Sequence, residues 1–180
     1  DVLGYSETRV PDAAFARDTS WTQAVDFVGR LREVAAAAGT GFGVKLSNTL
    51  IVENAAGFLP PAEKEVYLSG PPLHVLAIEL VRRFRRVFGG ELPVSFSAGI
   101  DRLNFPDAVA LGLAPVTVCT DLLKKGGYRR LAPYHAELAR RMDAVGARDV
   151  DSFVRRAYGP GADGETVADA RVRNAEHYAD

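Results

Sequence analysis

Two loops of small and polar residues follow short apolar segments in the second half of this chain. Ala98-Gly99-Ile100 comes after the apolar segment 94–96, and Cys119-Thr120 comes after the segment 115–118. A strand that ends in such a loop before a helix presents free backbone N–H groups, and the positive end of the helix dipole attracts anions. Paired loops on neighbouring strands are typical of the phosphate site in the last quarter of a (β/α)₈ barrel. We expect these loops to bind a phosphate, the alternative being ordinary tight turns.

A second polar segment contains Lys45, Ser47, Asn48 and Thr49. Alternate side chains of a strand share one face, so Lys45, Ser47 and Thr49 are expected to point the same way. A lysine inside an apolar barrel strand is costly unless it meets an anion or a polar ligand. The segment therefore predicts a cationic donor with an amide beside it, the alternative being a lysine that snorkels to the strand end.

Three further features carry weaker signals. Ser69-Gly70 follows an apolar segment and suits the close approach of a flat ligand, or a simple turn. His74, His135 and His177 show no metal-ligand spacing and are expected to be structural or exposed. Cys119 is expected to be a small buried hydrophobe, and a single cysteine excludes an internal disulfide or a self-contained metal cluster.

Composition indicates an ordinary globular domain. The chain has 180 residues, 47% hydrophobic and 25% charged, with a formal net charge of −1. That balance gives no reason to expect a nucleic-acid or membrane-surface partner, and no apolar run reaches the roughly 20 residues that span a bilayer. We expect a cytoplasmic protein. A complete (β/α)₈ barrel takes roughly 250 residues, so we expect about half of one, within a longer polypeptide.

Apolar periodicity and breakers predict an alternation of strands and helices, which favours parallel strands with crossover helices. The predicted helices span residues 21–38, 73–88, 107–111, 121–124, 128–145, 150–158 and 164–178. The predicted strands span residues 42–46, 65–68, 92–96 and 116–119, with 50–52 as an extension of the first or as a hairpin arm. Residues 1–18 are expected to be irregular, and four arginines of the helix 73–88 (Arg82, Arg83, Arg85 and Arg86) to lie mostly on its solvated face.

Taken in order, these motifs resemble the carboxyl-terminal half of the flavin barrel in the dihydroorotate and dihydropyrimidine dehydrogenase family. The strand that reads Val-Lys-Leu-Ser-Asn-Thr, the Leu-Ser-Gly turn, the strand before Gly99-Ile100 and the strand before Thr120 each have a counterpart there. The residues of these motifs are most similar to those of iron–sulfur flavoproteins of the selenate-reductase-like or glutamate-synthase-like kind. The chain departs from the family pattern at Ala98 and Cys119, where the family has glycine, and no general base can be assigned.

The resemblance implies a cofactor and its contacts. The backbone at Ala98-Gly99-Ile100 and Cys119-Thr120 would hold the phosphate of FMN, and Ser69 and Gly70 would line its ribityl side. Asn48 and Thr49 would face the flavin or the substrate, and Lys45 would lie near the ring, where a cation stabilises developing negative charge.

The resemblance also implies a domain plan and a function. Residues 19–147 would form the second half of a TIM-barrel flavin-type domain, and residues 148–180 a helical extension leading to a further module. The barrel would transfer hydride or electrons to a small unsaturated or heterocyclic substrate, with iron–sulfur clusters and an NAD(P)H/FAD site in redox modules elsewhere in the same longer polypeptide. The alternatives are a non-catalytic barrel that scaffolds redox modules, and a flavin-free phosphate-binding barrel enzyme.

Overall fold

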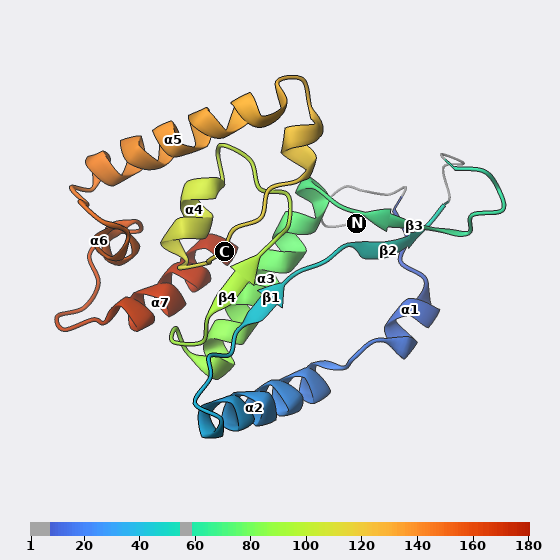
Figure 1. Cartoon of the computed structure of the whole chain (residues 1–180), viewed down its shortest axis with the longest axis horizontal. Coiled ribbons are helices and arrows are strands. Elements are labelled where there is room, and N and C mark those ends of the chain that lie inside the picture. The colour runs from blue at the N-terminus through green and yellow to red at the C-terminus, as the bar shows by residue number, and fades with distance from the viewer. Residues whose placement is uncertain (1–7, 55–58) are drawn as a thin grey trace.

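The computed structural model describes residues 8–54 and 59–180, and Figure 1 shows how its helices and strands are arranged. The helices are α1 (Asp12–Arg17), α2 (Trp21–Ala37), α3 (Pro71–Phe88), α4 (Phe105–Ala110), α5 (Leu131–Ala144), α6 (Val150–Arg156) and α7 (Val167–Ala179). The strands are β1 (Val44–Leu46), β2 (Leu50–Glu53), β3 (Glu65–Leu68) and β4 (Val94–Phe96). Two short 3₁₀ helices, η1 (Thr120–Leu123) and η2 (Gly127–Arg130), lie between α4 and α5.

A short parallel sheet forms the centre of the fold. β1 pairs in parallel with β4, with Lys45 opposite Ser95, and Phe96 forms a parallel bridge to Val116. Helices α3 and α4 connect these three neighbouring segments, which is the βαβ arrangement of a barrel wall. The expected half barrel is therefore reduced to three parallel segments, and the described residues contain no closed barrel. The predicted strand 116–119 survives only as the bridge at Val116.

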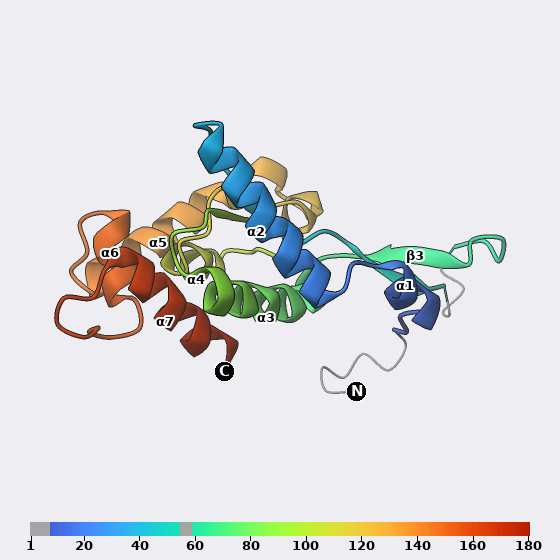
Figure 2. The ribbon, with the colours of Figure 1, turned by 90° about the horizontal axis from the view of Figure 1, so that it is seen from below.

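The predicted strand 65–68 exists but does not join this sheet. It forms β3, which pairs antiparallel with β2 from Leu50↔Leu68 to Glu53↔Glu65, so residues 50–53 are a hairpin arm. Only residues 47–49 separate β1 from β2, which is too short for the crossover that a parallel neighbour needs. In Figure 2 this hairpin projects away from the helical body of the molecule. The expectation that residues 65–68 form a parallel barrel strand is therefore wrong, because these residues pair antiparallel with β2.

The amino-terminal segment is not wholly irregular, because α1 occupies residues 12–17. Pro11 stands at its N-cap and Asp12 lies in its first turn. Proline near the start of a helix costs little, since the missing N–H has no intrahelical partner there, and an acidic residue in the first turn favours the dipole. The prediction that residues 1–18 are irregular is therefore wrong for residues 12–17.

The other helices match their predicted positions with small shifts at the ends. Ser20 caps α2 by accepting from the Gln23 amide, and Gly39 follows the helix with φ +65°. The helix predicted over residues 121–124 is the 3₁₀ turn η1, and the helix predicted from residue 128 begins as η2 before α5. The tail helix α7 begins only at Val167, where Thr166 and Asp169 form a capping box.

The main hydrophobic core lies between the parallel sheet and helices α3, α4 and α7. Val81, Phe96 and Leu111 are completely buried there, and α3 and α7 pack side by side, as Figure 2 shows. The core therefore packs α3, β4 and the loop after α4 together as one unit. None of the described helices has the length and apolar character that spanning a membrane requires.

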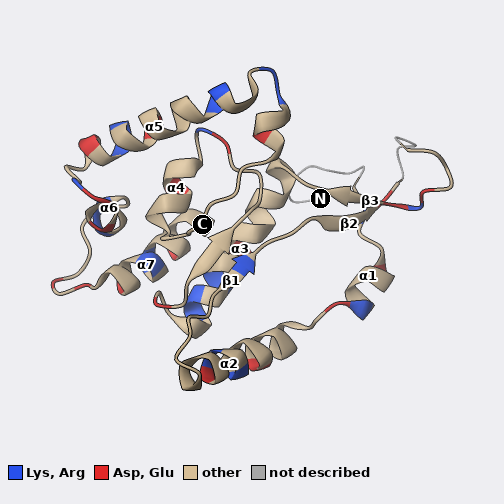
Figure 3. Ribbon diagram, in the orientation of Figure 1, with Lys and Arg blue, Asp and Glu red and all other residues tan. Residues whose placement is uncertain are grey.

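The arginines of α3 divide into exposed and buried ones. Arg82 and Arg86 pair with Glu176 of α7, whereas Arg85 is only 2% exposed and donates to the carbonyl oxygens of Gly90 and Leu92 at 3.1 and 2.8 Å. Burial lowers the pKa of Arg85 to about 10. The predicted solvated face is therefore wrong for Arg85. Elsewhere acidic and basic residues alternate, as along α2 and α5 in Figure 3.

Candidate functional site

One cavity of about 240 Å³ opens at the carboxyl ends of β1 and β4. Nine of the ten predicted site residues line it: Asn48, Thr49, Ser69, Gly70, Ala98, Gly99, Ile100, Cys119 and Thr120. Leu73, Ser97 and Thr117 complete the wall. The carboxyl-terminal ends of barrel strands are where barrel enzymes bind their ligands, so the cavity has the position expected of an active site.

Lys45 is the predicted residue that does not line this cavity. It lies in the middle of β1 between Val44 and the buried Leu46, and its side chain is exposed. Because its register partner is Ser95, Lys45 and Ser95 share the face of the sheet opposite to buried Leu46 and Phe96. Lys45 is thus on the open face of the wall, one step before the strand end.

The loops of the cavity contact one another through glycines. Gly99 has φ +54°, and a Cβ there would lie 2.5 Å from the carbonyl oxygen of Gly70 and 2.8 Å from Cα of Pro71. A Cβ on Gly70 would lie 3.3 Å from Cγ2 of Thr120. Only glycine allows this approach. Three loops that are distant in sequence, those at residues 70, 99 and 120, therefore meet at one point.

The Cys119-Thr120 loop is fixed from behind by a buried carboxylate. Asp121 is 4% exposed and accepts from Arg130 Nη2 at 2.7 Å, from the Tyr134 hydroxyl at 2.8 Å and from Lys124 Nζ at 3.1 Å. Hydrogen bonds from Arg130, above all, hold the pKa of Asp121 well below its usual range. Burial, together with Asp121, raises the pKa of Tyr134 above its ordinary value. Asp121 is therefore an ionised anchor of the loop and not a free general base.

Cys119 is exposed and lies in the cavity wall, so the expectation of a buried cysteine is wrong. The cause is the short third segment, because pairing ends at Val116 and residues 117–119 leave the sheet before the cysteine. Within residues 8–54 and 59–180, no three His, Cys, Asp or Glu side chains come together as a metal site would require.

The cavity offers backbone donors rather than charged side chains. The N–H groups of Gly99 and Ile100 have no hydrogen-bond acceptor among the residues that the structure describes. The Thr120 hydroxyl lies in the same wall. Unpaired amides beside a hydroxyl and a close glycine–glycine approach suit an anion with several oxygens, such as a phosphate.

Some residues of the site were missed by the sequence interpretation. Ser97 and Thr117 follow β4 and Val116 directly, and their position at the strand ends could have indicated them. His74 was expected to have a structural or exposed role, which agrees with its contact of 2.8 Å from Nδ1 to the carbonyl oxygen of Ala98, but its place beside this loop was not predicted. That contact arises from the packing of α3 against the loop, and no local pattern signals it.

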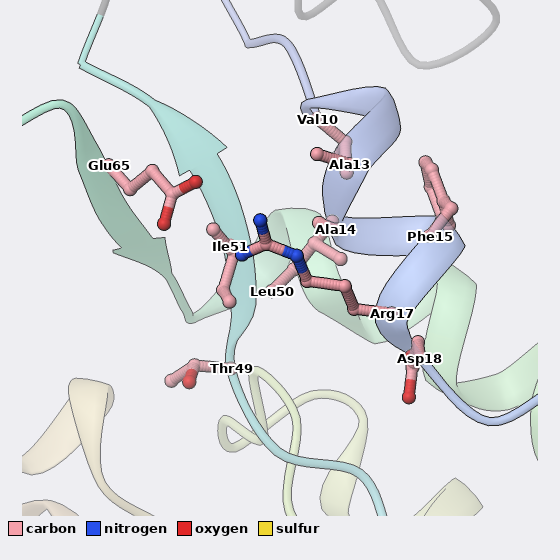
Figure 4. A pocket seen from close by; sticks show the side chains of 10 residues that line it. All are labelled: Val10, Ala13, Ala14, Phe15, Arg17, Asp18, Thr49, Leu50, Ile51 and Glu65. Carbon is pink, nitrogen blue, oxygen red and sulfur yellow. The ribbon is translucent and has the colours of Figure 1, made fainter.

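A second hollow, of about 340 Å³, lies between α1 and the hairpin (Figure 4). Figure 4 shows Arg17 reaching from α1 across this groove towards Ile51, with Glu65 on the far side. Thr49 lines both this groove and the cavity. Most other side chains of the groove are apolar, including Phe15, which is 64% exposed.

Comparison with known proteins identifies relatives of this chain. Residues 1–160 match the family model described as "Oxidoreductase YgfK, N-terminal TIM-barrel domain". Proteins named "Putative oxidoreductase YgfK", from Escherichia coli strain K12 and from Escherichia coli O157:H7, are each 40% identical over 151 residues, covering 84% of this chain and 14% of the relative. The chain thus spans about one seventh of the length of these curated relatives.

A solved structure shares the fold. The ligand-free type DHODH from Eimeria tenella matches with a TM-score of 0.53 and 22% identity, over 75% of this chain and 36% of that one. At this identity the likeness concerns the fold alone, and it agrees with the parallel segments and crossover helices of a barrel wall.

Proposed function

Because this chain belongs to the family of oxidoreductase YgfK N-terminal TIM-barrel domains, we propose that it is the flavin-binding barrel segment of a larger oxidoreductase and that its cavity binds FMN. The observation that carries the proposal is the meeting of the loops at residues 70, 99 and 120 around two backbone amides that have no acceptor within residues 8–54 and 59–180. A phosphate ester fits that donor set, since its oxygens accept several N–H groups at once.

Different residues of the cavity would contact different parts of FMN. The N–H groups of Gly99 and Ile100 and the Thr120 hydroxyl would donate to the phosphate. Ser69 and Gly70 would line the ribityl chain, where the absence of a side chain at Gly70 allows close approach. Asn48 and Thr49, which also line the cavity, would face the ring or the substrate.

Bound flavin would supply hydride or electron transfer for a small unsaturated or heterocyclic substrate. Lys45, on the open face of β1, would place a positive charge beside the ring and stabilise negative charge that develops there. No residue of this chain is assigned as a general acid or base.

The larger protein would supply the rest of the redox path. The chain spans 14% of the length of its curated relatives, and we assign iron–sulfur clusters and an NAD(P)H/FAD site to redox modules outside it. Membership of the selenate-reductase-like or glutamate-synthase-like subgroup stays a prediction.

A non-catalytic barrel that docks redox modules is a second candidate, favoured by the departures at Ala98 and Cys119 and by the position of Lys45 outside the cavity. The two candidates differ in flavin content. For the FMN barrel, the purified full-length protein keeps its flavin absorbance after desalting, and acid extraction of the protein releases FMN.

Two variants test where the flavin binds. Gly99→Val blocks the phosphate loop and abolishes the FMN of this domain, and Lys45→Ala lowers FMN affinity about fivefold, the value of one ordinary hydrogen bond. Unchanged FMN occupancy in both variants would contradict the site, and a folded wild-type protein without FMN would favour the scaffold.

A further inference from the structure

Three consecutive carbonyl groups of the loop Ala98-Gly99-Ile100 are each held by a side chain from a different element. His74 Nδ1 of α3 lies 2.8 Å from the Ala98 oxygen. Asn104 Nδ2, before α4, donates to the Gly99 oxygen at 3.0 Å, and the Tyr134 hydroxyl of α5 donates to the Ile100 oxygen at 3.2 Å. An ordinary tight turn does not need three separate side-chain donors, so this arrangement calls for a physical reason.

The carbonyl contacts fix the directions of the amides. In a planar trans peptide the C=O of one residue and the N–H of the next point in opposite directions. Holding the Ala98 and Gly99 oxygens therefore turns the N–H groups of Gly99 and Ile100 away from His74 and Asn104. The next amide, of Asp101, is taken by Asn104 Oδ1 at 2.8 Å. Two adjacent donors are left available to a ligand in the cavity.

His74 is itself held by the last turn of the chain's final helix. The Ala98 oxygen can only accept, so Nδ1 carries the proton, and Nε2 accepts from the Tyr178 hydroxyl at 3.0 Å. Tyr178 belongs to α7, which lies beyond residues 1–160 matched by the family model. Helix α7, which lies outside the residues matched by the family model, is thus connected to the Ala98 carbonyl by the two hydrogen bonds of the His74 ring.

The position of α7 is fixed by buried contacts. Asn174 is completely buried and donates through Nδ2 to the carbonyl oxygens of Ala110 and Val154, both at 2.7 Å. Glu176 accepts from Arg82 and Arg86 of α3. The ion pairs join α7 to α3, the helix that carries His74. They therefore hold Tyr178 of α7 close to His74, and the packing of the two helices supports the Tyr178–His74 hydrogen bond.

We propose that His74, held by Tyr178 of α7, is a positioning residue that presets the Gly99 and Ile100 amides for a phosphate group. The proposal deepens the proposed function and rests on it for the identity of the ligand, FMN. It makes α7 a working part of the cofactor site, although none of its residues lines the cavity.

The test compares FMN with riboflavin, which has the same ring and ribityl chain but no phosphate. Flavin-free full-length protein is titrated with each, and binding is followed by the quenching of flavin fluorescence. His74→Leu is expected to weaken FMN about tenfold and Tyr178→Phe about threefold, the value of one hydrogen bond or less, while riboflavin affinity stays within twofold. His74→Asn, which keeps a donor for the Ala98 oxygen, restores most of the FMN affinity.

The matched control is Tyr128→Phe, because Tyr128 is 82% exposed; it should change neither affinity. An equal loss of FMN and riboflavin in the His74 and Tyr178 variants would mean that these residues only support the fold, and it would overturn the proposal. Unchanged FMN affinity in both variants would also overturn it.

A further arm separates this proposal from the proposed function. If wild-type protein binds neither flavin, the FMN assignment fails, and protection of the protein against thermal unfolding by inorganic phosphate becomes the readout. The positioning role then stands if Tyr178→Phe loses protection that Tyr128→Phe keeps. It is overturned if the two variants behave alike.

Discussion

The FMN-site cavity and the groove between α1 and the hairpin differ in the contacts that support their walls. The groove between α1 and the hairpin is the larger, at about 340 Å³ against about 240 Å³. Its wall is a short helix without buried residues and a hairpin that projects from the body. The wall of the smaller cavity consists of loops tied to α3, α5 and the core. Between these two, size alone would favour the groove as the binding site.

The difference teaches that fixed donors, more than volume, mark the candidate site. Binding energy is lost when groups must be ordered as the ligand arrives, so donors that are already fixed bind more tightly. Gly99 and Ile100 present amides that the fold has already oriented, whereas the groove offers a long flexible Arg17 and apolar side chains.

Gly99→Ala is expected to have the largest effect. Its Cβ would lie within 3 Å of backbone atoms of Gly70 and Pro71 at a positive φ, so strain and overpacking together cost about 3 kcal/mol. The matched control is Gly39→Ala, which has the same backbone region with nothing within 4 Å and costs about 1 kcal/mol. Urea unfolding measures both, and equal losses would contradict the packing of the loops.

Thr120→Val is expected to weaken FMN about tenfold by removing one hydroxyl donor near charged oxygens. The substitution keeps the shape of the side chain, including the Cγ2 that approaches Gly70. Riboflavin affinity should be unchanged, because riboflavin lacks the phosphate. Titration with both flavins measures this, and a loss shared by both would place Thr120 against the ring instead.

Acid should lower the stability of the fold by protonating Glu137 of α5, which pairs with Arg140 and Arg141. Hydrogen bonds from Arg140 lower the pKa of Glu137 on α5 to about 2, from an ordinary value of 4.5. A carboxylate whose folded pKa is depressed stabilises the fold above its unfolded pKa, and this contribution is lost as the pH falls from about 4.5 to about 2.

Urea midpoints measured between pH 6 and pH 3 should therefore fall, and Glu137→Gln should flatten part of that decline. Asp143→Asn is a matched control on the same helix. A variant at Glu137 whose pH dependence equals that of the wild type would show that the ion pairs with Arg140 and Arg141 do not contribute.

Arg17→Ala is expected to have the smallest effect. The side chain crosses the larger groove (Figure 4) and does not line the cavity. FMN affinity should stay within twofold of the wild type, measured in the same titration. A tenfold loss of FMN affinity would indicate that the flavin binds in the groove and not in the cavity.

The sequence predicted the neighbourhood of the site better than its support. Small-residue loops after apolar segments, together with the polar segment that contains Asn48 and Thr49, located nine of the residues that line the cavity, because strand ends in a barrel wall share one edge. Turn residues such as Gly70 and Gly99 are readable locally, since their conformation is set by their own lack of a side chain.

The parts that could not be predicted depend on contacts between distant residues. The antiparallel pairing of β3, the buried position of Arg85 and the contact of His74 with Ala98 are decided by tertiary packing. Lys45 was expected at the ligand because of its strand position, but the pocket begins only after β1 ends. Cys119 is exposed because sheet pairing stops at Val116.

The structure of the protein crystallised with FMN tests the central claim most directly. We expect phosphate oxygens within hydrogen-bond distance of the Gly99 and Ile100 amides and of the Thr120 hydroxyl, with the His74–Ala98 and Tyr178–His74 contacts intact. FMN bound in the groove beside Arg17, or a phosphate directed away from the Gly99 loop, would contradict it.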